Sequence, residues 1–242
     1  LEDDDKQWLS LRYDLTAPLA RYVAENYDSL PKPFRRFQWG PVWRNEKPGP
    51  GRYRQFLQID ADTVGAGNMG ADAEICMMAA DCMAALGIGE GDYLVRINNR
   101  KIMDGLLQRI GLTNEQADYE TRRLTILRAM DKYDRLGLAG VRDLLGAGRR
   151  DESGDFTAGA GLDDAQIDAV AGLVSTQGAS RPEMLDALEA QIGDTASGAG
   201  GIAELREMDA LFTRLGYGVE RLCIDPTIVR GLGYYTGPVY EI

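Results

Sequence analysis

A short stretch near the N-terminus gathers side chains suited to binding an anion. Between residues 32 and 54 the only acid is Glu46, whereas the whole chain carries a formal net charge of −11. The basic residues of this stretch are Lys32, Arg35, Arg36, Arg44, Lys47, Arg52 and Arg54. Aromatic residues lie among them, and the arginine fork pairs with phosphate through two hydrogen bonds. The stretch therefore predicts a pocket for a ligand that is both anionic and planar, such as a nucleotide.

The pattern around these residues predicts a β-hairpin. Residues 37–43 and 53–59 both have the alternation of extended strands. Between them, residues 47–51 (KPGPG) cannot continue a helix or a ladder, because proline fixes φ and lacks an N–H donor. The hairpin would place Arg44 and Glu46 at the root of the loop. For the basic residues alone, a sheet edge protected by charge is the alternative.

The order of residues in this hairpin resembles a known motif. Arg44-x-Glu46, a short loop and Arg52-x-x-x-Phe56 resemble motif 2 of the class II aminoacyl-tRNA synthetases. The fuller string GRYRQFLQIDAD, residues 51–62, resembles the histidyl-tRNA synthetases in particular.

Two further segments resemble the same family, in the same order along the chain. VRGLGYYTG, residues 229–237, resembles its histidine-specific signature, although Gly233 stands where the family usually has Asp. LRYDLT, residues 11–16, resembles an early amino-acid-binding segment of its eukaryote-like branch. The resemblance covers residues 1–112 and the last part of the chain, and leaves the middle undefined.

The resemblance implies an ATP site in the hairpin. Arg44 would act as a catalytic residue that holds the α-phosphate, and Arg52 would reach the outer phosphates. Glu46 would face the adenine edge or the end of a tRNA. Phe56 would stack on adenine, and a core aromatic is the alternative for this residue.

The resemblance also implies a histidine pocket. Its residues would be Asp14, Thr16, Gln58, Asp62, Arg230, Tyr234 and Tyr235. Asp14, Thr16 and Gln58 suit the ammonium group, while Asp62 and a tyrosine hydroxyl suit the ring nitrogens. Arg230 would be a second catalytic arginine, placed near the carboxylate and α-phosphate opposite Arg44. An acidic strand face is the alternative for Asp62 and its neighbour Asp60.

The composition excludes several kinds of catalysis. The chain contains no histidine residue, which removes Ser-His and Cys-His triads and any imidazole base. Cys76, Cys82 and Cys223 have no ligand-like spacing, so we expect no bound metal and no permanently bound cofactor. Cys76 and Cys82 are predicted to be buried thiols, which favours a reducing cytoplasmic location. The sequence contains no apolar run of about 18 residues, so no membrane span is predicted.

Hydrophobic spacing predicts an α+β fold with helices flanking a mainly antiparallel sheet, and the resemblance implies that this fold is of the class II synthetase type. Besides the hairpin of residues 34–65, helices are expected at 11–26 (after Asp14), 71–86 and 101–110, and strands at 93–97 and 219–224. Residues 146–161 and 193–201 are rich in Gly, Ala and Ser and are expected to be loop connections. We expect a first part of the catalytic core (1–112), a helical insertion domain (113–215) and a return of the core (216–242).

The resemblance implies a histidine–tRNA ligase. Histidine and ATP, bound as its Mg²⁺ complex, would form histidyl-adenylate, and histidine would then pass to the 3′ end of tRNA(His). A cytoplasmic homodimer is expected, with its dimer motif before Leu1 and a further ATP motif beyond Ile242, so that this chain is a portion of a catalytic domain. Because a net charge of −11 opposes phosphate binding, we expect tRNA affinity mainly outside this chain, with help from the insertion.

Two alternatives stay open. A non-catalytic paralogue of this family serves as the regulatory subunit of ATP phosphoribosyltransferase, and it keeps a histidine pocket without needing the ATP residues. The presence of Arg44, Glu46, Arg52 and Phe56 favours the enzyme. A class II synthetase for another amino acid is disfavoured by the tyrosine pair at 234–235.

Overall fold

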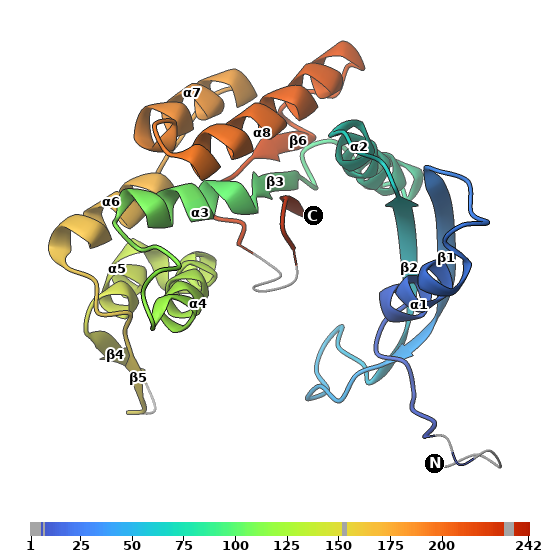
Figure 1. Ribbon diagram of the computed structural model, residues 1–242, viewed down its shortest axis with the longest axis horizontal. Helices are drawn as coiled ribbons and strands as arrows, with labels where there is room; N and C mark the ends of the chain where they lie inside the picture. The colour runs from blue at the N-terminus through green and yellow to red at the C-terminus, as the bar shows by residue number, and fades with distance from the viewer. Residues whose placement is uncertain (1–5, 7, 152–153, 230–234) are drawn as a thin grey trace. The chain divides into compact units, whose positions relative to one another are not determined.

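The computed structural model describes residues 6, 8–151, 154–229 and 235–242 (Figure 1). The chain divides into two compact units, Leu1–Ala71 and Asp72–Ile242. Both units combine helices with strands that pair mainly antiparallel, so the predicted α+β fold is confirmed. Among the described helices, none has the length and apolar character that crossing a bilayer requires.

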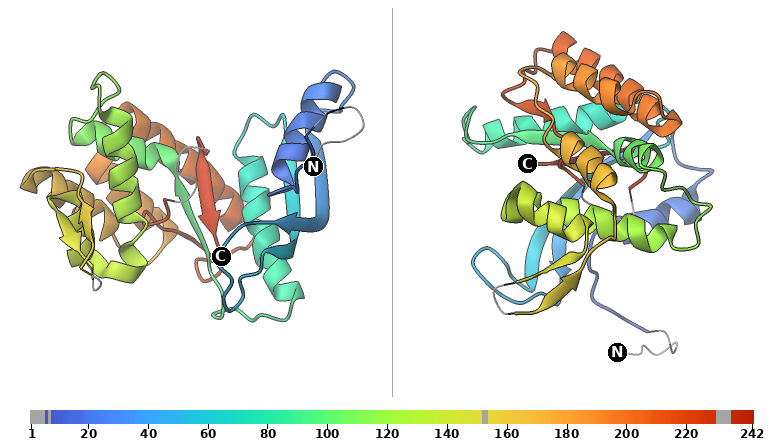
Figure 2. Two further views of the ribbon diagram at one scale, coloured as in Figure 1. Left: turned by 90° about the horizontal axis from the view of Figure 1, so that it is seen from below. Right: turned by 90° about the vertical axis from the view of Figure 1, so that its left-hand side faces the viewer.

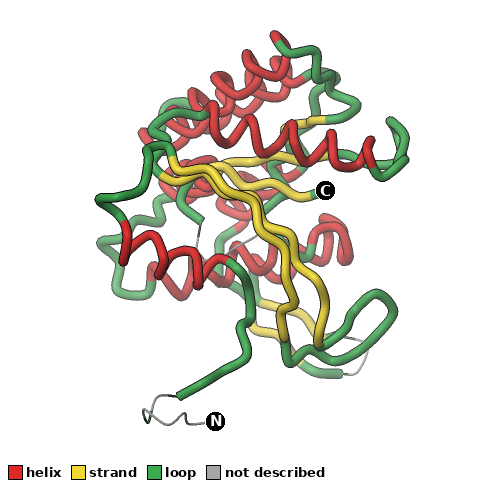
Figure 3. Tube along the Cα trace, turned by 90° about the vertical axis from the view of Figure 1, so that its right-hand side faces the viewer, coloured by secondary structure: helices red, strands yellow, loops and turns green. Residues whose placement is uncertain are grey.

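The first unit is built on a long β-hairpin. Strands β1 (Phe34–Trp43) and β2 (Gln55–Val64) pair antiparallel along their whole length, as their aromatic and β-branched residues favour. Figure 3 shows the two strands running side by side. In the connecting loop, Gly49 and Arg52 exchange backbone hydrogen bonds of 3.2 and 2.9 Å, and Gly51 supplies the positive φ of 69°. The predicted hairpin is confirmed.

Side-chain alternation gives the hairpin two different faces. One face is apolar and carries four side chains that are more than half exposed: Phe37, Trp39, Leu57 and Ile59. The opposite face is polar and carries partly buried side chains: Arg36, Gln38, Gln58, Asp60 and Asp62. The polar face therefore gathers the hydrogen-bonding groups of the unit.

The segment that precedes the first helix is fixed to β1. The backbone N–H of Trp43 donates to the Arg12 carbonyl at 2.9 Å, and Arg12 Nε donates to the Pro41 carbonyl at 2.8 Å. Gly40 leaves room for this crossing, because a Cβ there would lie 2.6 Å from Arg12 Nη2. The contacts anchor residues 11–15 beside the strand.

Helix α1 (Thr16–Asn26) begins after Asp14, as predicted. Asp14 Oδ1 accepts a hydrogen bond of 2.9 Å from the Ala17 N–H, which satisfies one of the free donors of the first turn. Leu15 and Leu19 are buried, whereas Tyr22 is half exposed. The carboxylate of Asp14 thus has a structural partner.

A three-stranded sheet forms the centre of the second unit. Strand β3 (Val95–Asn99) lies between β6 (Leu222–Ile224), its parallel neighbour, and β7 (Pro238–Glu241), its antiparallel neighbour. All but one of the five residues of β3 are buried. The strand predicted at 219–224 is confirmed as β6, although it begins at Leu222 and not at residue 219.

Helices make up most of the rest of this unit, and Figure 2 shows α7 and α8 lying side by side. The helices are α2 (Gly70–Ala85), α3 (Arg100–Arg109), α4 (Tyr119–Met130), α5 (Tyr133–Leu145), α6 (Asp164–Val174), α7 (Arg181–Ile192) and α8 (Ala196–Arg214). Side chains cap the last three: Asp163 forms a capping box with Gln166, and Ser180 and Thr195 accept from the first turn.

The loop predicted at 193–201 is wrong from Ala196 onward, where α8 begins. Its glycines lie at a close helix crossing: a Cβ on Gly105 of α3 would lie 2.6 Å from the Gly198 Cα. Likewise, a Cβ on Gly201 would lie 2.9 Å from the Lys101 Cβ. Glycine is needed here for packing, and the buried contact offsets its low helix propensity.

The loop predicted at 146–161 is also partly wrong. It contains two short antiparallel strands, β4 (Gly148–Arg150) and β5 (Phe156–Ala158). A Cβ on Gly148 or Gly159 would overlap the backbone across this ladder at 2.3 Å or 2.1 Å. Glycine is therefore needed at these positions, because the neighbouring backbone lies too close to leave room for a Cβ atom.

The cysteines are only partly as predicted. Cys76 is buried, whereas Cys82 is exposed, so the prediction for Cys82 is wrong. Both residues lie on α2, but their separation of six positions turns them to different sides of the helix. Burial raises the pKa of the Cys76 thiol, and burial together with Asp225 raises that of Cys223 to about 11. Within the described residues, no group of three or more His, Cys, Asp or Glu side chains could hold a metal ion.

Candidate functional site

A cavity of about 530 Å³ lies at the loop end of the hairpin. It is lined by Arg44, Glu46, Lys47, Gly51, Arg52, Tyr53 and Phe56. The structure thus brings together all four residues that the sequence places at an ATP site. The lining combines three cations with two aromatic rings, the chemistry expected of a pocket for a charged and planar ligand.

Arg44 is held between two aromatic rings. Its guanidinium carbon lies 4.7 Å from the centre of the Tyr13 ring and 5.0 Å from the centre of the Phe56 ring. Nε donates to the Tyr13 carbonyl at 3.4 Å. Among the described residues Arg44 forms no ion pair, and cation–π contacts fix its position without neutralising its charge. Both Nη groups are therefore available to an anion.

Arg52 and Glu46 face each other across the cavity. Arg52 Nη1 lies 3.6 Å from Glu46 Oε2, and the Arg52 side chain is 73% exposed. An exposed pair at this distance contributes about 1 kcal/mol or less, so a ligand displaces it at little cost. Arg54 Nε donates to the Glu46 carbonyl at 3.4 Å and steadies the loop.

The polar face of the hairpin forms a second cluster. Arg36 Nη2 lies 3.0 Å from Asp62 Oδ2, and both side chains are mostly buried. Burial, with a smaller contribution from Asp60, raises the pKa of Asp62, although Arg36 opposes the shift. Two buried polar atoms here have no hydrogen-bond partner among the described residues, Arg36 Nε and Gln58 Oε1, whereas Asp62 Oδ2 has the ion pair with Arg36. Such exceptions are rare in folded proteins and indicate a place for a polar ligand.

Asp60 joins two of the predicted pocket residues. Its Oδ1 accepts from Gln58 Nε2 at 2.6 Å, and its Oδ2 accepts from Thr16 Oγ1 at 3.4 Å. Sequence reasoning left Asp60 and Arg36 out of the site. The signal that could have found them is the strand period, because 58, 60 and 62 share one face and Arg36 pairs opposite Asp62.

Three other predicted residues belong to a later part of the chain. Arg230 and Tyr234 lie outside the described residues. Tyr235 belongs to the second unit, and its side chain is half exposed. Asp14 lies two residues before the pocket residue Thr16, but its carboxylate accepts a hydrogen bond from the Ala17 N–H in the first turn of α1.

Comparisons with known proteins identify the family of this chain. A model of the histidyl-tRNA synthetase family matches residues 1–242. A histidine–tRNA ligase from Methylocella silvestris is 56% identical over 240 residues, which are 99% of this chain and 47% of that protein. The chain thus spans about half the length of the curated relatives it matches.

Solved structures show the same fold. Histidyl-tRNA synthetase from Nostoc sp. aligns with a TM-score of 0.78 at 30% identity, over 95% of this chain and 48% of that one. An ATP phosphoribosyltransferase regulatory subunit/histidyl-tRNA synthetase from Bacillus halodurans aligns with a TM-score of 0.75 at 25% identity, over 100% and 56%. The α+β fold is therefore of the class II aminoacyl-tRNA synthetase type. Within that class, the chain belongs to the histidyl-tRNA synthetase family.

Proposed function

We propose that this chain is part of a histidine–tRNA ligase, which joins histidine and ATP into histidyl-adenylate and transfers histidine to the 3′ end of tRNA(His). The observation that carries the proposal is the uncommitted guanidinium of Arg44, fixed between Tyr13 and Phe56 at the cavity. ATP would bind there as its Mg²⁺ complex.

The proposed reaction needs no base from the protein. The histidine carboxylate is already a nucleophile and attacks the α-phosphorus, while pyrophosphate leaves. Arg44 would stabilise the charge that develops on the α-phosphate, and Arg230 would be the second arginine of this step. Arg52 would hold the outer phosphates, Glu46 would face the adenine edge, and Phe56 would stack on the base. These roles suit a chain without histidine residues.

The polar face of the hairpin would recognise the amino acid. Thr16 and Gln58, with Asp60, would accept from the ammonium group, and Asp14 would contribute nearby. Asp62, Tyr234 and Tyr235 would read the ring nitrogens. The partnerless Gln58 Oε1 supports this assignment, because a ligand that donates a hydrogen bond there satisfies it.

Replacing Asp62 by asparagine should raise the KM for histidine by about 10- to 100-fold, because a charge-assisted hydrogen bond is lost. The KM for ATP should change less than about threefold, since Asp62 lies on the polar face and not in the cavity. Steady-state ATP–pyrophosphate exchange measures both constants. Asp28→Asn, at an exposed position of the same unit, is the control. An equal rise in both KM values would refute the assignment of Asp62 to histidine.

We also propose the domain organisation expected from the sequence: core residues 1–112, a helical insertion at 113–215 and a core return at 216–242. It is supported by β3, whose two neighbours, β6 and β7, both follow the insertion in the chain. The proposed protein acts as a homodimer in the cytoplasm.

The insertion carries a basic groove that would contribute to tRNA binding. Lys132, Arg135 and Arg149 line a cavity of about 530 Å³, and Arg128 lines a smaller one of about 150 Å³ beside it. Among the described residues none of these four side chains forms an ion pair. In a chain of net charge −11, such a group of unpaired cations favours a phosphate backbone.

Replacing Lys132, Arg135 and Arg149 together by alanine should raise the KM for tRNA. The slope of log KM against log salt concentration should become shallower, by an amount that corresponds to the loss of up to about three phosphate contacts. Histidine-dependent ATP–pyrophosphate exchange should not change. Aminoacylation of tRNA(His) between low and moderate salt measures the slope. Arg206→Ala is the control, because Arg206 already pairs with Asp186 and Glu189. An unchanged slope in the triple variant would rule out this groove as a tRNA contact.

A second function rests on the similarity to the Bacillus halodurans protein, whose name gives a regulatory subunit as well as a synthetase. A regulatory paralogue would bind histidine without activating it. The test is histidine-dependent ATP–pyrophosphate exchange by the complete gene product, with the other amino acids as controls. Exchange with histidine alone supports the ligase, and histidine binding without exchange supports the regulatory subunit.

A further inference from the structure

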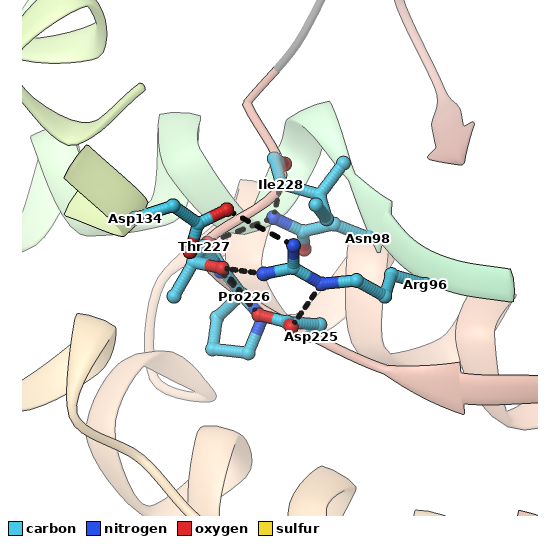
Figure 4. A network of polar contacts seen from close by, with 7 residues as sticks. All are labelled: Arg96, Asn98, Asp134, Asp225, Pro226, Thr227 and Ile228. Atoms are coloured by element: carbon cyan, nitrogen blue, oxygen red, sulfur yellow. Dashed lines mark hydrogen bonds and ion pairs between the residues drawn. The ribbon is translucent and has the colours of Figure 1, made fainter. Parts of the chain in front are cut away.

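Arg96 of β3 holds the start of the segment 225–229, which leads directly into Arg230. Its Nε donates to Asp225 Oδ2 at 2.7 Å and its Nη2 donates to Thr227 Oγ1 at 2.7 Å (Figure 4). Nη1 donates to Asp134 of α5 at 3.1 Å. One guanidinium thus joins the central strand, the segment and the insertion.

Asn98, two residues further along β3, holds the middle of the same segment. Its Nδ2 donates to the Pro226 carbonyl at 3.1 Å and to the Ile228 carbonyl at 2.9 Å, as Figure 4 shows. The side chain has no exposed surface. Both amide hydrogens are therefore used on backbone carbonyls, and this position requires a side chain that donates twice.

Arg100, at the start of α3, holds both ends of the segment 230–236. Nη1 donates to the carbonyl of Val229, the residue before it, at 3.4 Å. The backbone N–H of Arg100 donates to the carbonyl of Gly237, the residue after it, at 2.9 Å. Beyond Gly237 the chain enters β7, where Pro238 pairs with Asn99. The entry and the exit of 230–236 thus meet at one residue.

The guanidinium of Arg100 is buried without a carboxylate partner. The residue is 1% exposed, and neither Nε nor Nη2 has a hydrogen-bond partner among the described residues. Burial and the nearby Arg123 lower the pKa of Arg100, while Asp104 opposes them. Burying a guanidinium with free N–H groups is costly, and a residue used only for packing would be apolar.

We propose that Arg100, supported by Asn98 and Arg96, is a positioning residue that brackets the loop 230–236 and orients Arg230 for adenylate formation. The expected effect on adenylate formation rests on the proposed function, whereas the contacts of Arg100 with Val229 and Gly237 do not. Arg100 would act through the loop and not by touching ATP.

The test replaces Arg100 with methionine or lysine, and Asn98 with aspartate, in the complete gene product. Lysine keeps the charge but loses the fork, and aspartate keeps the shape of Asn98 but loses both donors. Arg109→Met, at the other end of α3, is the matched control, because Arg109 pairs with the exposed Asp194. Two readouts are needed: amide hydrogen exchange of the peptide spanning 226–238, and the kinetics of ATP–pyrophosphate exchange.

In Arg100→Met and Asn98→Asp, the peptide should exchange faster than in the wild type while α8 keeps its protection, which shows that the unit is folded. The kcat should fall by about 100-fold, as expected for a misplaced catalytic group, with the KM for histidine changed less than about threefold. Arg100→Lys should lie between the wild type and Arg100→Met. The control should match the wild type.

Unchanged peptide exchange in Arg100→Met would overturn the bracket. Faster peptide exchange with an unchanged kcat would overturn the positioning role and leave the proposed function standing. A wild-type protein without histidine-dependent exchange would refute the proposed function and with it the positioning role. In that case the difference in hydrogen exchange of the 226–238 peptide between the wild type and Arg100→Met would still show whether Arg100 holds the two ends of residues 230–236.

Discussion

Replacing Arg44 with alanine should lower the rate of histidyl-adenylate formation by about 10²- to 10³-fold. The guanidinium is held by Tyr13 and Phe56 before any ligand binds, so its charge is already in place when the α-phosphate becomes more negative. An arginine pre-positioned in this way stabilises the transition state more than the ground state. The KM for histidine should therefore change far less than the rate.

Single-turnover formation of adenylate from histidine and ATP measures this effect directly. Arg21→Ala is the control, because Arg21 is an exposed arginine of the same unit that pairs with Glu25 on its own helix. Arg44→Lys separates charge from geometry, since lysine keeps the charge but cannot offer the paired donors of the fork. A variant with a raised KM for ATP and an unchanged rate would show that Arg44 binds the ground state only.

The second large effect concerns stability. Arg181→Met should lower the free energy of unfolding of the second unit by about 3 to 5 kcal/mol. Arg181 is 6% exposed, and its Nε lies 2.5 Å from Asp209 Oδ1. It also donates to the carbonyls of Leu222 and Tyr217 at 2.9 and 3.0 Å. Methionine fills much of the volume but leaves the mostly buried carboxylate of Asp209 without its ion-pair partner and removes a donor from each of the two carbonyls.

Native-state hydrogen exchange of α7 and α8 measures this free energy in the relevant part of the molecule. Arg206→Met is the control: Arg206 pairs with Asp186 and Glu189 near the surface, and its loss should cost about 1 kcal/mol or less. Equal protection in the two variants would mean that the Arg181 network contributes no more than a surface pair. The double variant Arg181→Met/Asp209→Leu should recover part of the loss, because no charge is then left buried alone.

The hairpin and helices α1, α2 and α3 could be predicted because their signals are local. Strand alternation, the Pro-Gly loop and the apolar period of α1, α2 and α3 each lie within a few residues, and their ends shift by only a few positions. The start of α8 could not be predicted, because its glycines are explained by α3, a helix nearly a hundred residues earlier. Local propensity is outweighed wherever two backbones must approach.

The same limit applies to the site. Arg44, Glu46, Arg52 and Phe56 lie close together in the sequence, and the structure gathers them around one cavity. Asp60 required knowledge of the register, because its importance comes from contacts with Gln58 and Thr16 together. Arg100 could not be recognised at all from sequence spacing, since its partners, Val229 and Gly237, lie far along the chain.

The order of strands in the second unit has a consequence for synthesis of the protein. Strand β3 emerges from the ribosome long before β6 and β7, the two strands that cover its edges. At typical rates of translation the delay is on the order of ten seconds. During this time a strand that ends up almost wholly buried has both edges unpaired, while the helices that follow can already form. The nascent chain is therefore most exposed to aggregation or chaperone capture at β3, and the C-terminal strand ends that period.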